Sequence, residues 1–241
     1  MDGVSTSRTA LVTGANKGIG FAIARGLGAI GFQVAVGARD EARGAEAVAR
    51  LRGDGVDAFA LALDVTSDAS VAAAAAAVER TAGGLDVLVN NAGIAGGTEG
   101  GAQDPTTLDL DVLRTVLETN VLGAVRVTNA FLPQLRRAPS PRIVNMSSTM
   151  ASLALRTGPV LAAYAPSKSL LNSLTVQYAR QLADTHVLVN AACPGFVATD
   201  LTGFAAPRTP EQGAAIAVRL ATLPDGGSSG GFFDDDGPVP W

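Results

Sequence analysis

The sequence predicts an α/β protein built on a doubly wound parallel sheet of about seven strands, with helices on both faces. Short, nearly continuous apolar runs alternate with longer segments of helical composition, which is typical of parallel strands buried on both faces. A glycine-rich stretch follows the first apolar run, where such a fold turns from strand to helix. The length of 241 residues, 47% of them hydrophobic, suits one domain with a large core.

The elements are expected in alternation along the chain. The strands are the apolar runs 9–14, 32–38, 56–63, a strand within 85–93, 142–147, 186–192 and a short last strand at 228–234. The helices lie between them at 18–30, 41–53, 68–82, about 109–137, 163–184 and 209–221. The last helix opens with a capping box of Thr209, Pro210 and Gln212. One domain over residues 1–241 is therefore predicted, with residues 1–7 as a flexible N-terminus.

Composition excludes several classes of function. The net charge of −4 comes without a basic block, which argues against nucleic acid as a partner. The longest apolar run considered as a membrane span, Val71–Val78, is far shorter than the roughly 20 residues that a span needs. The single cysteine, Cys193, excludes an internal disulfide and a cysteine-based zinc cluster, and no metal is expected. Because no secretory signal is visible, a cytoplasmic protein is predicted.

The glycine-rich stretch is TGANKGIG, residues 13–20, with glycines at 14, 18 and 20. In a doubly wound sheet, the first strand-to-helix turn faces a ligand crevice at the carboxyl ends of the strands. Glycines let the backbone turn sharply and approach a pyrophosphate, which a helix N-terminus favours. The position predicts a dinucleotide site, although three glycines alone also fit an ordinary turn.

TGANKGIG resembles the cofactor loop of the short-chain dehydrogenase/reductase family, which reads TGxxxGIG. Four more of the family's motifs follow in its order: LDV (63–65), NNAG (90–93), YAPSK (164–168) and PGFVATD (194–200). The likeness covers about residues 8–241, and the ending GGFFDDDGPVPW is similar to the carbonyl-reductase-like branch. The resemblance implies a single Rossmann-like domain that acts as an NAD(P)-dependent oxidoreductase.

The resemblance also implies which residues bind the cofactor. These are Gly14, Asn16, Lys17, Gly18, Ile19, Gly20, Arg39, Asp64, Val65, Asn91, Ala92, Gly93, Tyr164, Lys168, Pro194, Gly195, Val197 and Thr199. Ala38 stands where NAD-binding relatives carry an acid, and Arg39 after it can pair with a 2′-phosphate. With Lys17 as a second cation, NADP(H) is the expected cofactor. Asp40 is interpreted as the N-cap of the helix at 41–53.

Tyr164 and Lys168 are four residues apart and so share one helix face. Tyr164 is predicted to be the general acid/base, and the ammonium of Lys168 to stabilise the phenolate and lower its pKa. By resemblance, Ser148 polarises the substrate oxygen, with Ser147 in support. By the same resemblance, Asn120 kinks its helix and anchors a water near the lysine.

The predicted function is NADPH-dependent reduction of a ketone or aldehyde, a small-molecule carbonyl substrate, to an alcohol. One alternative is a 3-oxoacyl carrier-protein or polyketide-type ketoreductase, for which Arg136, Arg137 and Arg142 are candidates for a basic patch. Another is a non-catalytic NADP(H)-sensing regulator, which would have no need of the proton relay. A serine hydrolase is excluded, because the only histidine, His186, begins a strand and no G-x-S-x-G motif occurs.

The substrate pocket and the assembly are predicted from the same resemblance. Candidates for the apolar pocket are Met150, Val160, Phe196 and Phe204, each of which also suits a core position. The 16-residue separation of Ser148 and Tyr164 leaves no room for the insertion that makes some carbonyl reductases monomeric. A homodimer or homotetramer through the helices at 109–137 and 163–184 is expected.

Overall fold

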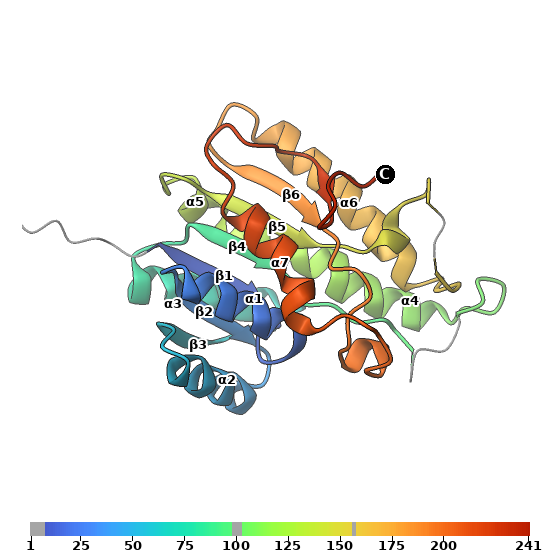
Figure 1. Ribbon diagram of the computed structural model, residues 1–241, viewed down its shortest axis with the longest axis horizontal. Coiled ribbons are helices and arrows are strands. Elements are labelled where there is room, and N and C mark those ends of the chain that lie inside the picture. The colour runs from blue at the N-terminus through green and yellow to red at the C-terminus, as the bar shows by residue number, and fades with distance from the viewer. Residues whose placement is uncertain (1–7, 98–102, 156–157) are drawn as a thin grey trace, which may run out of the picture.

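The computed structural model describes residues 8–97, 103–155 and 158–241, so the predicted flexible segment 1–7 lies outside the described residues. Its centre is one seven-stranded sheet in the order β3-β2-β1-β4-β5-β6-β7, with every neighbouring pair parallel (Figure 1). The strand order reverses direction beside β1, as in a doubly wound sheet. The predicted fold class is confirmed.

The elements lie close to their predicted positions. The strands are β1 (Thr9–Thr13), β2 (Gln33–Ala38), β3 (Ala58–Ala62), β4 (Val87–Asn90), β5 (Arg142–Met146), β6 (Leu188–Ala192) and β7 (Phe232–Phe233). The helices are α1 (Gly18–Ala29), α2 (Glu41–Gly53), α3 (Asp68–Ala82), α4 (Leu110–Leu117), α5 (Gly123–Leu135), α6 (Tyr164–Gln181) and α7 (Pro210–Ala221). Short 3₁₀ turns form η2 (Thr149–Ala151) and η3 (Asp200–Thr202). The expected helix at 109–137 is divided, because a π-helical turn, η1 (Glu118–Leu122), separates α4 from α5.

Two apolar layers cover the sheet. Helices α1, α2 and α7 pack on one face, and α3, α5 and α6 pack on the other. Within β1, Ala10 and Val12 point into the first layer and Leu11 into the second, and all three are fully buried. Burial on both faces explains why the strand sequences are apolar throughout and do not alternate with polar residues.

Local capping follows the sequence. Thr209 accepts a hydrogen bond from the backbone N–H of Gln212, whose side chain accepts one from the N–H of Thr209, so the predicted capping box is confirmed. Asp40 accepts from the N–H of Arg43 and caps α2, as expected. Within the described residues, no helix is both long and apolar enough to cross a membrane.

Arg142, proposed for an exposed basic patch, is instead buried at the start of β5, with 1% of its surface accessible. Its guanidinium donates to the carbonyl oxygen of Leu223 at 2.6 and 2.9 Å and to Asp225 at 2.8 Å. The assignment of Arg142 to a basic patch is therefore wrong, because the chain after α7 folds over this side chain. Of the two remaining candidates, Arg137 is paired with Glu79.

Candidate active site

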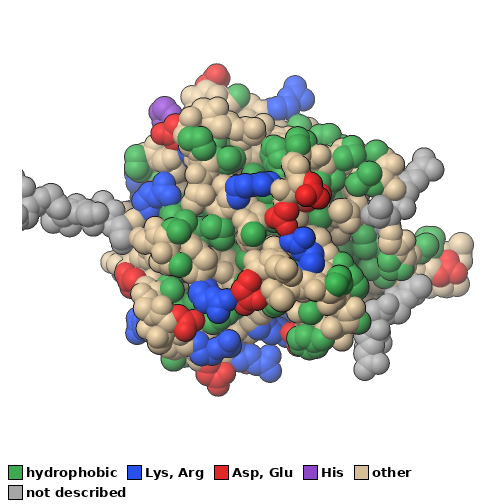
Figure 2. Space-filling model, viewed as in Figure 1, with side chains coloured by type: hydrophobic (Ala, Val, Ile, Leu, Met, Phe, Trp, Pro, Cys, Tyr) green, Lys and Arg blue, Asp and Glu red, His purple; other side chains and the backbone are tan. Residues whose placement is uncertain are grey.

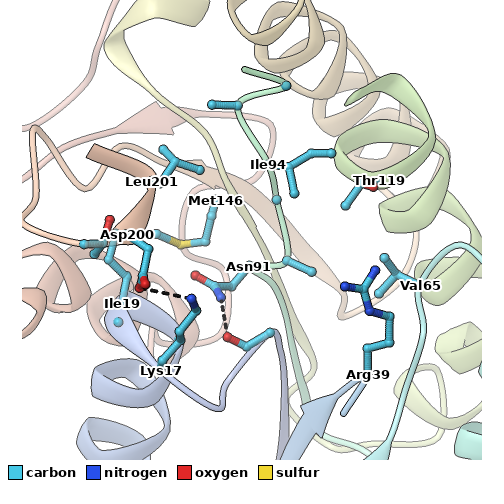
Figure 3. Close-up of a pocket in the computed structure, with 18 of the residues that line it drawn as sticks. Lys17, Ile19, Arg39, Val65, Asn91, Ile94, Thr119, Met146, Asp200 and Leu201 are labelled. Carbon is cyan, nitrogen blue, oxygen red and sulfur yellow. Dashed lines mark hydrogen bonds and ion pairs between the residues drawn. The ribbon is translucent and has the colours of Figure 1, made fainter. Parts of the chain in front are cut away.

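A cleft of about 1240 Å³ opens at the carboxyl ends of the strands, between the glycine loop and the segments that follow β2, β4, β5 and β6 (Figure 3). This exceeds the roughly 300–1,000 Å³ of a typical small-molecule pocket. Predicted residues that line it are Gly14, Asn16, Lys17, Gly18, Ile19, Gly20, Arg39, Asp64, Val65, Asn91, Ala92, Gly93, Tyr164, Lys168, Pro194 and Thr199.

Two predicted cofactor residues, Gly195 and Val197, are not part of this lining. Val197 is 3% exposed and packs against Gly213 of α7. Gly195 lies against the side chain of Arg208. Gly195 is exposed, whereas Val197 is buried and forms a β-bridge with Arg208.

The glycine loop needs its glycines for backbone reasons. Gly14 and Gly18 have φ angles of 64° and 56°, in the left-handed region that favours glycine. At Gly20, a Cβ atom would clash with the carbonyl oxygen of Gly14. The loop therefore exposes backbone at the N-terminus of α1, where a phosphate group is favoured.

The NNAG segment holds the glycine loop in place. The amide of Asn91 donates to the carbonyl oxygens of Thr13 and Gly14 at 2.8 and 3.2 Å. In return, the Thr13 hydroxyl accepts from the backbone N–H groups of Asn91 and Ala92, each at 2.9 Å. Asn91 thus acts on the shape of the cleft as well as lining it.

Tyr164 and Lys168 lie one turn apart at the start of α6, with the lysine Nζ 5.7 Å from the centre of the tyrosine ring. Lys168 is 5% exposed, and its ammonium donates to the carbonyl oxygen of Met146 at 2.8 Å. Ser148, two residues after β5, is near enough to Tyr164 for its hydroxyl to act on the pKa of the phenol. Tyr164 and Lys168 therefore line the cleft together, and Ser148 lies beside the tyrosine.

The two adjacent serines differ in direction. Ser147 is buried, and its hydroxyl donates to Oδ1 of Asn172 at 2.7 Å inside the protein. Ser148 is half-buried and faces Tyr164. Ser147 also lines the cleft, but its hydroxyl is bound to Asn172, so Ser148 is the serine whose hydroxyl acts on the tyrosine.

Burial decides the protonation of the pair. Desolvation raises the pKa of Tyr164 to about 12, although the hydrogen bond with Ser148 acts in the opposite direction. Desolvation lowers the pKa of Lys168 to about 8. Lys168 is not among the groups that set this pKa, and its ammonium donates to the Met146 carbonyl, so the stabilisation of the phenolate by Lys168 stays a prediction. At neutral pH the phenol is protonated, which suits a proton donor.

Asn120 lies in the π-helical turn η1 and is 1% exposed. Its Oδ1 accepts from the N–H of Ile94 at 2.8 Å, and its Nδ2 donates to the carbonyl of Ile94 at 2.9 Å and to the Ser167 hydroxyl at 3.0 Å. These bonds link the helix, interrupted at this π-helical turn, to the segment after β4; the expected kink and the water near Lys168 stay predictions. A Cβ at Gly93 would lie 3.3 Å from Asn120 Oδ1 and 3.4 Å from Lys168 Nζ, so a glycine lets these groups approach.

The two predicted phosphate-binding cations have different surroundings. Arg39 is exposed at the end of β2 and has no ion-pair partner within the described ranges. Hydrogen bonds from Thr66 are the main cause that lowers the pKa of Asp64, and the charge of Arg39 adds to it. Lys17 instead points to Asp200, with Nζ 3.1 Å from Oδ2 (Figure 3).

The apolar candidates are not core residues. Val160, Phe196 and Phe204 are 59%, 57% and 66% exposed, while Met150 is half-buried. Apolar side chains that the sequence analysis missed line the cleft itself: Ile94, Met146 and Leu201. Each is next to residues that the sequence had already marked as functional, Ile94 after NNAG, Leu201 after PGFVATD and Met146 before Ser147. That position along the chain could have identified them. Among the described residues, no group of three His, Cys, Asp or Glu side chains could hold a metal ion.

Comparison with known proteins places the chain in a family. The short chain dehydrogenase family model matches residues 8–209. Carbonyl reductase [NADPH] 1 of Rattus norvegicus is 36% identical over 96% of this chain and 98% of its own. (−)-Isopiperitenone reductase of Mentha piperita is 34% identical over 95% and 96%. The solved structure of actinorhodin polyketide ketoreductase with NADPH is 32% identical, with a TM-score of 0.83 over 95% of each chain. The chain therefore belongs to the short-chain dehydrogenase/reductase family of oxidoreductases and is similar to its carbonyl reductases.

Proposed function

We propose that this protein reduces a ketone or aldehyde to an alcohol with NADPH. The observation that carries the proposal is the position of Tyr164 and Lys168 in a cleft that begins at the glycine loop, with Ser148 beside the tyrosine. The similarity to a carbonyl reductase with NADPH in its name supports both the reaction and the cofactor.

The residues of the cleft fit a dinucleotide. The backbone around Gly14, Gly18 and Gly20 forms a cradle that side chains would fill, and it would hold the phosphates. Arg39, which has no ion-pair partner within the described ranges, would take the 2′-phosphate, and Lys168 would bind near the nicotinamide ribose. When bound, the reduced nicotinamide supplies a hydride to the carbonyl carbon.

The protein's own groups manage the charge and the proton. The Ser148 hydroxyl donates a hydrogen bond to the carbonyl oxygen as negative charge develops there. The Tyr164 phenol donates its proton to that oxygen, since a pKa of about 12 keeps it protonated at neutral pH. The nearby Lys168 ammonium, still charged below a pKa of about 8, stabilises the phenolate that remains. Asn120 holds the segment after β4 beside this lysine.

Replacing Tyr164 with Phe tests the proposal, because it deletes only the proton donor. We expect carbonyl reduction to fall to background while NADPH still binds. A panel of ketones, aldehydes, quinones and acyl thioesters, followed by loss of NADPH absorbance, measures turnover, and NADPH fluorescence titration measures binding. Turnover within a few-fold of the parent protein would contradict the role of Tyr164.

A carrier-protein or polyketide-type ketoreductase is the second candidate, favoured by the similarity to actinorhodin polyketide ketoreductase. Such an enzyme meets an acidic carrier protein, so a basic surface would support it. The burial of Arg142 and the pairing of Arg137 with Glu79 weaken the expected patch. On the face shown in Figure 2, basic and acidic side chains are interspersed among the described residues. Thioesters in the panel separate the two candidates.

We also propose that this protein is cytoplasmic and assembles as a homodimer or homotetramer through α4, α5 and α6. Exposed leucines on these helices support it: Leu110 is 58% exposed, Leu122, where η1 meets α5, 48% and Leu170 44%. Such apolar side chains in water favour burial in an interface. A monomer in light scattering at micromolar concentration would exclude the assembly.

A further inference from the structure

Two loops of opposite charge meet at the edge of the cleft. Lys17 of the glycine loop and Asp200, the first residue of η3, form an ion pair with Nζ 3.1 Å from Oδ2 (Figure 3). Both residues line the cleft, and their side chains are 55% and 56% exposed. The bond to Lys17 holds the pKa of the Asp200 carboxyl below its ordinary value. When a ligand enters the cleft, the Lys17 ammonium is therefore already paired with the Asp200 carboxylate.

The backbone holds Asp200 in this position. The Thr202 hydroxyl donates to the carbonyl of Val197 at 2.7 Å and accepts from the N–H of Thr199 at 3.1 Å, which closes the turn that contains Asp200. The loop also packs against the glycine loop, since a Cβ at Gly18 would lie 3.3 Å from Cγ2 of Thr199. The pairing thus follows from how the two loops fit together.

The three cations of this region have different partners. Arg43 lies 3.6 Å from Asp40, its neighbour on α2, and Lys17 is paired with Asp200. Across the part of the chain that the structure describes, Arg39 has no acidic partner in an ion pair. Figure 3 shows Lys17 and Arg39 on separate sides of the cleft, with Lys17 directed towards Asp200. A phosphate bound beside Arg39 would therefore compete with Asp200 for the Lys17 ammonium.

We propose that Asp200 is a positioning residue for cofactor choice. By pairing with Lys17, it withholds this cation from a 2′-phosphate and weakens the preference for NADP(H) over NAD(H). The inference rests on the proposed function, because the phosphate is that of NADP(H). Binding exchanges one anion for another at the lysine, and no covalent bond changes. Exposed ion pairs of this kind change an equilibrium at most about fivefold, so a two- to fivefold effect is expected.

The experiment uses the whole protein without cofactor and two probes, adenosine 2′,5′-bisphosphate and 5′-AMP, which differ only in the 2′-phosphate. Isothermal titration calorimetry measures both dissociation constants for the parent, Asp200→Asn, Lys17→Met and the double variant. Glu211→Gln is the matched control, because Glu211 forms an ion pair of similar exposure with Arg25 at 2.8 Å between α1 and α7.

We expect Asp200→Asn to tighten the bisphosphate about two- to fivefold and to change AMP less than twofold. Glu211→Gln should leave the ratio of the two constants unchanged. In the Lys17→Met background, Asp200→Asn should have no such effect, and 1 M salt should reduce the effect in the parent background because it screens exposed charges.

An unchanged or weaker affinity of Asp200→Asn for the bisphosphate overturns the inference. Tightening that persists without Lys17 also overturns it, because Asp200 would then act by simple repulsion. If the parent binds both probes equally, the proposed NADP(H) preference fails, yet a gain in Asp200→Asn still supports the role of Asp200. If the parent prefers the bisphosphate and Asp200→Asn does not change this, the cofactor proposal stands and the inference falls.

Discussion

Ser147 and Ser148 are neighbours in the chain but have opposite surroundings, so replacing each with alanine should produce opposite defects. Side chains alternate along extended backbone, which sends the Ser147 hydroxyl inward to Asn172 and the Ser148 hydroxyl towards Tyr164. Ser148→Ala should impair catalysis, and Ser147→Ala should impair stability.

The size of each effect follows from the contacts. Removing a hydrogen-bond donor at a developing oxyanion lowers kcat by roughly 10²–10³-fold, which we expect for Ser148→Ala. In the described residues, Nδ2 of the buried Asn172 already has no hydrogen-bond partner, so Ser147→Ala leaves its Oδ1 without its serine donor as well. An unsatisfied buried group costs about 1–3 kcal/mol, and each kcal/mol is worth about 2–4 °C in Tm for a domain of this size. Ser147→Ala should thus lower Tm by several degrees with much less effect on kcat.

The assay pairs thermal unfolding with initial rates at saturating NADPH and one good substrate. The double variant Ser147→Ala with Asn172→Leu is the control, because removing both partners should restore stability that the single variant lost. If Ser147→Ala loses more activity than Ser148→Ala, or if Ser148→Ala is the less stable of the two, the assignment of the two hydroxyls is refuted.

Three other predictions concern charged residues. Ala38→Asp combined with Arg39→Leu should turn a preference for NADPH of roughly 10–100-fold into a preference for NADH, because a charge-assisted hydrogen bond is worth ~1.5–3 kcal/mol. The values of kcat/KM with each cofactor measure this, and a parent that uses both cofactors equally contradicts the role of Arg39. Arg142→Met should lower the free energy of unfolding by about 1–3 kcal/mol, because it leaves the half-buried carbonyl of Leu223 without its donor. The exposed Arg137→Met should lower it by less than about 1 kcal/mol, and equal effects in urea titrations would refute this. The pKa of Lys168 falls from 10.5 to about 8 on folding, so between pH 8 and 10 the unfolded chain binds more protons than the folded one. The free energy of unfolding of the parent should therefore rise with pH relative to that of Lys168→Met, by up to about 1.4 kcal/mol per pH unit. A parallel pH dependence of the two proteins would exclude this burial effect.

Short-range patterns in the sequence determined most of the architecture and part of the site. The three glycines of the first turn, the capping box at Thr209 and the spacing of Tyr164 and Lys168 each depend on residues within eight positions. Backbone sterics and helix geometry act over the same distance, so these features could be predicted from the sequence alone.

Contacts between distant segments were decided only by the tertiary structure. Asn120 meets the segment after β4 and interrupts a helix that looked continuous, and the chain after α7 buries Arg142. Desolvation raises the pKa of Tyr164, against the direction expected from Lys168 alone. Lys17 is paired with Asp200, which lies almost at the other end of the chain. Charge partners and desolvation depend on which segments the fold brings together, and the spacing of residues along the sequence carries no record of that.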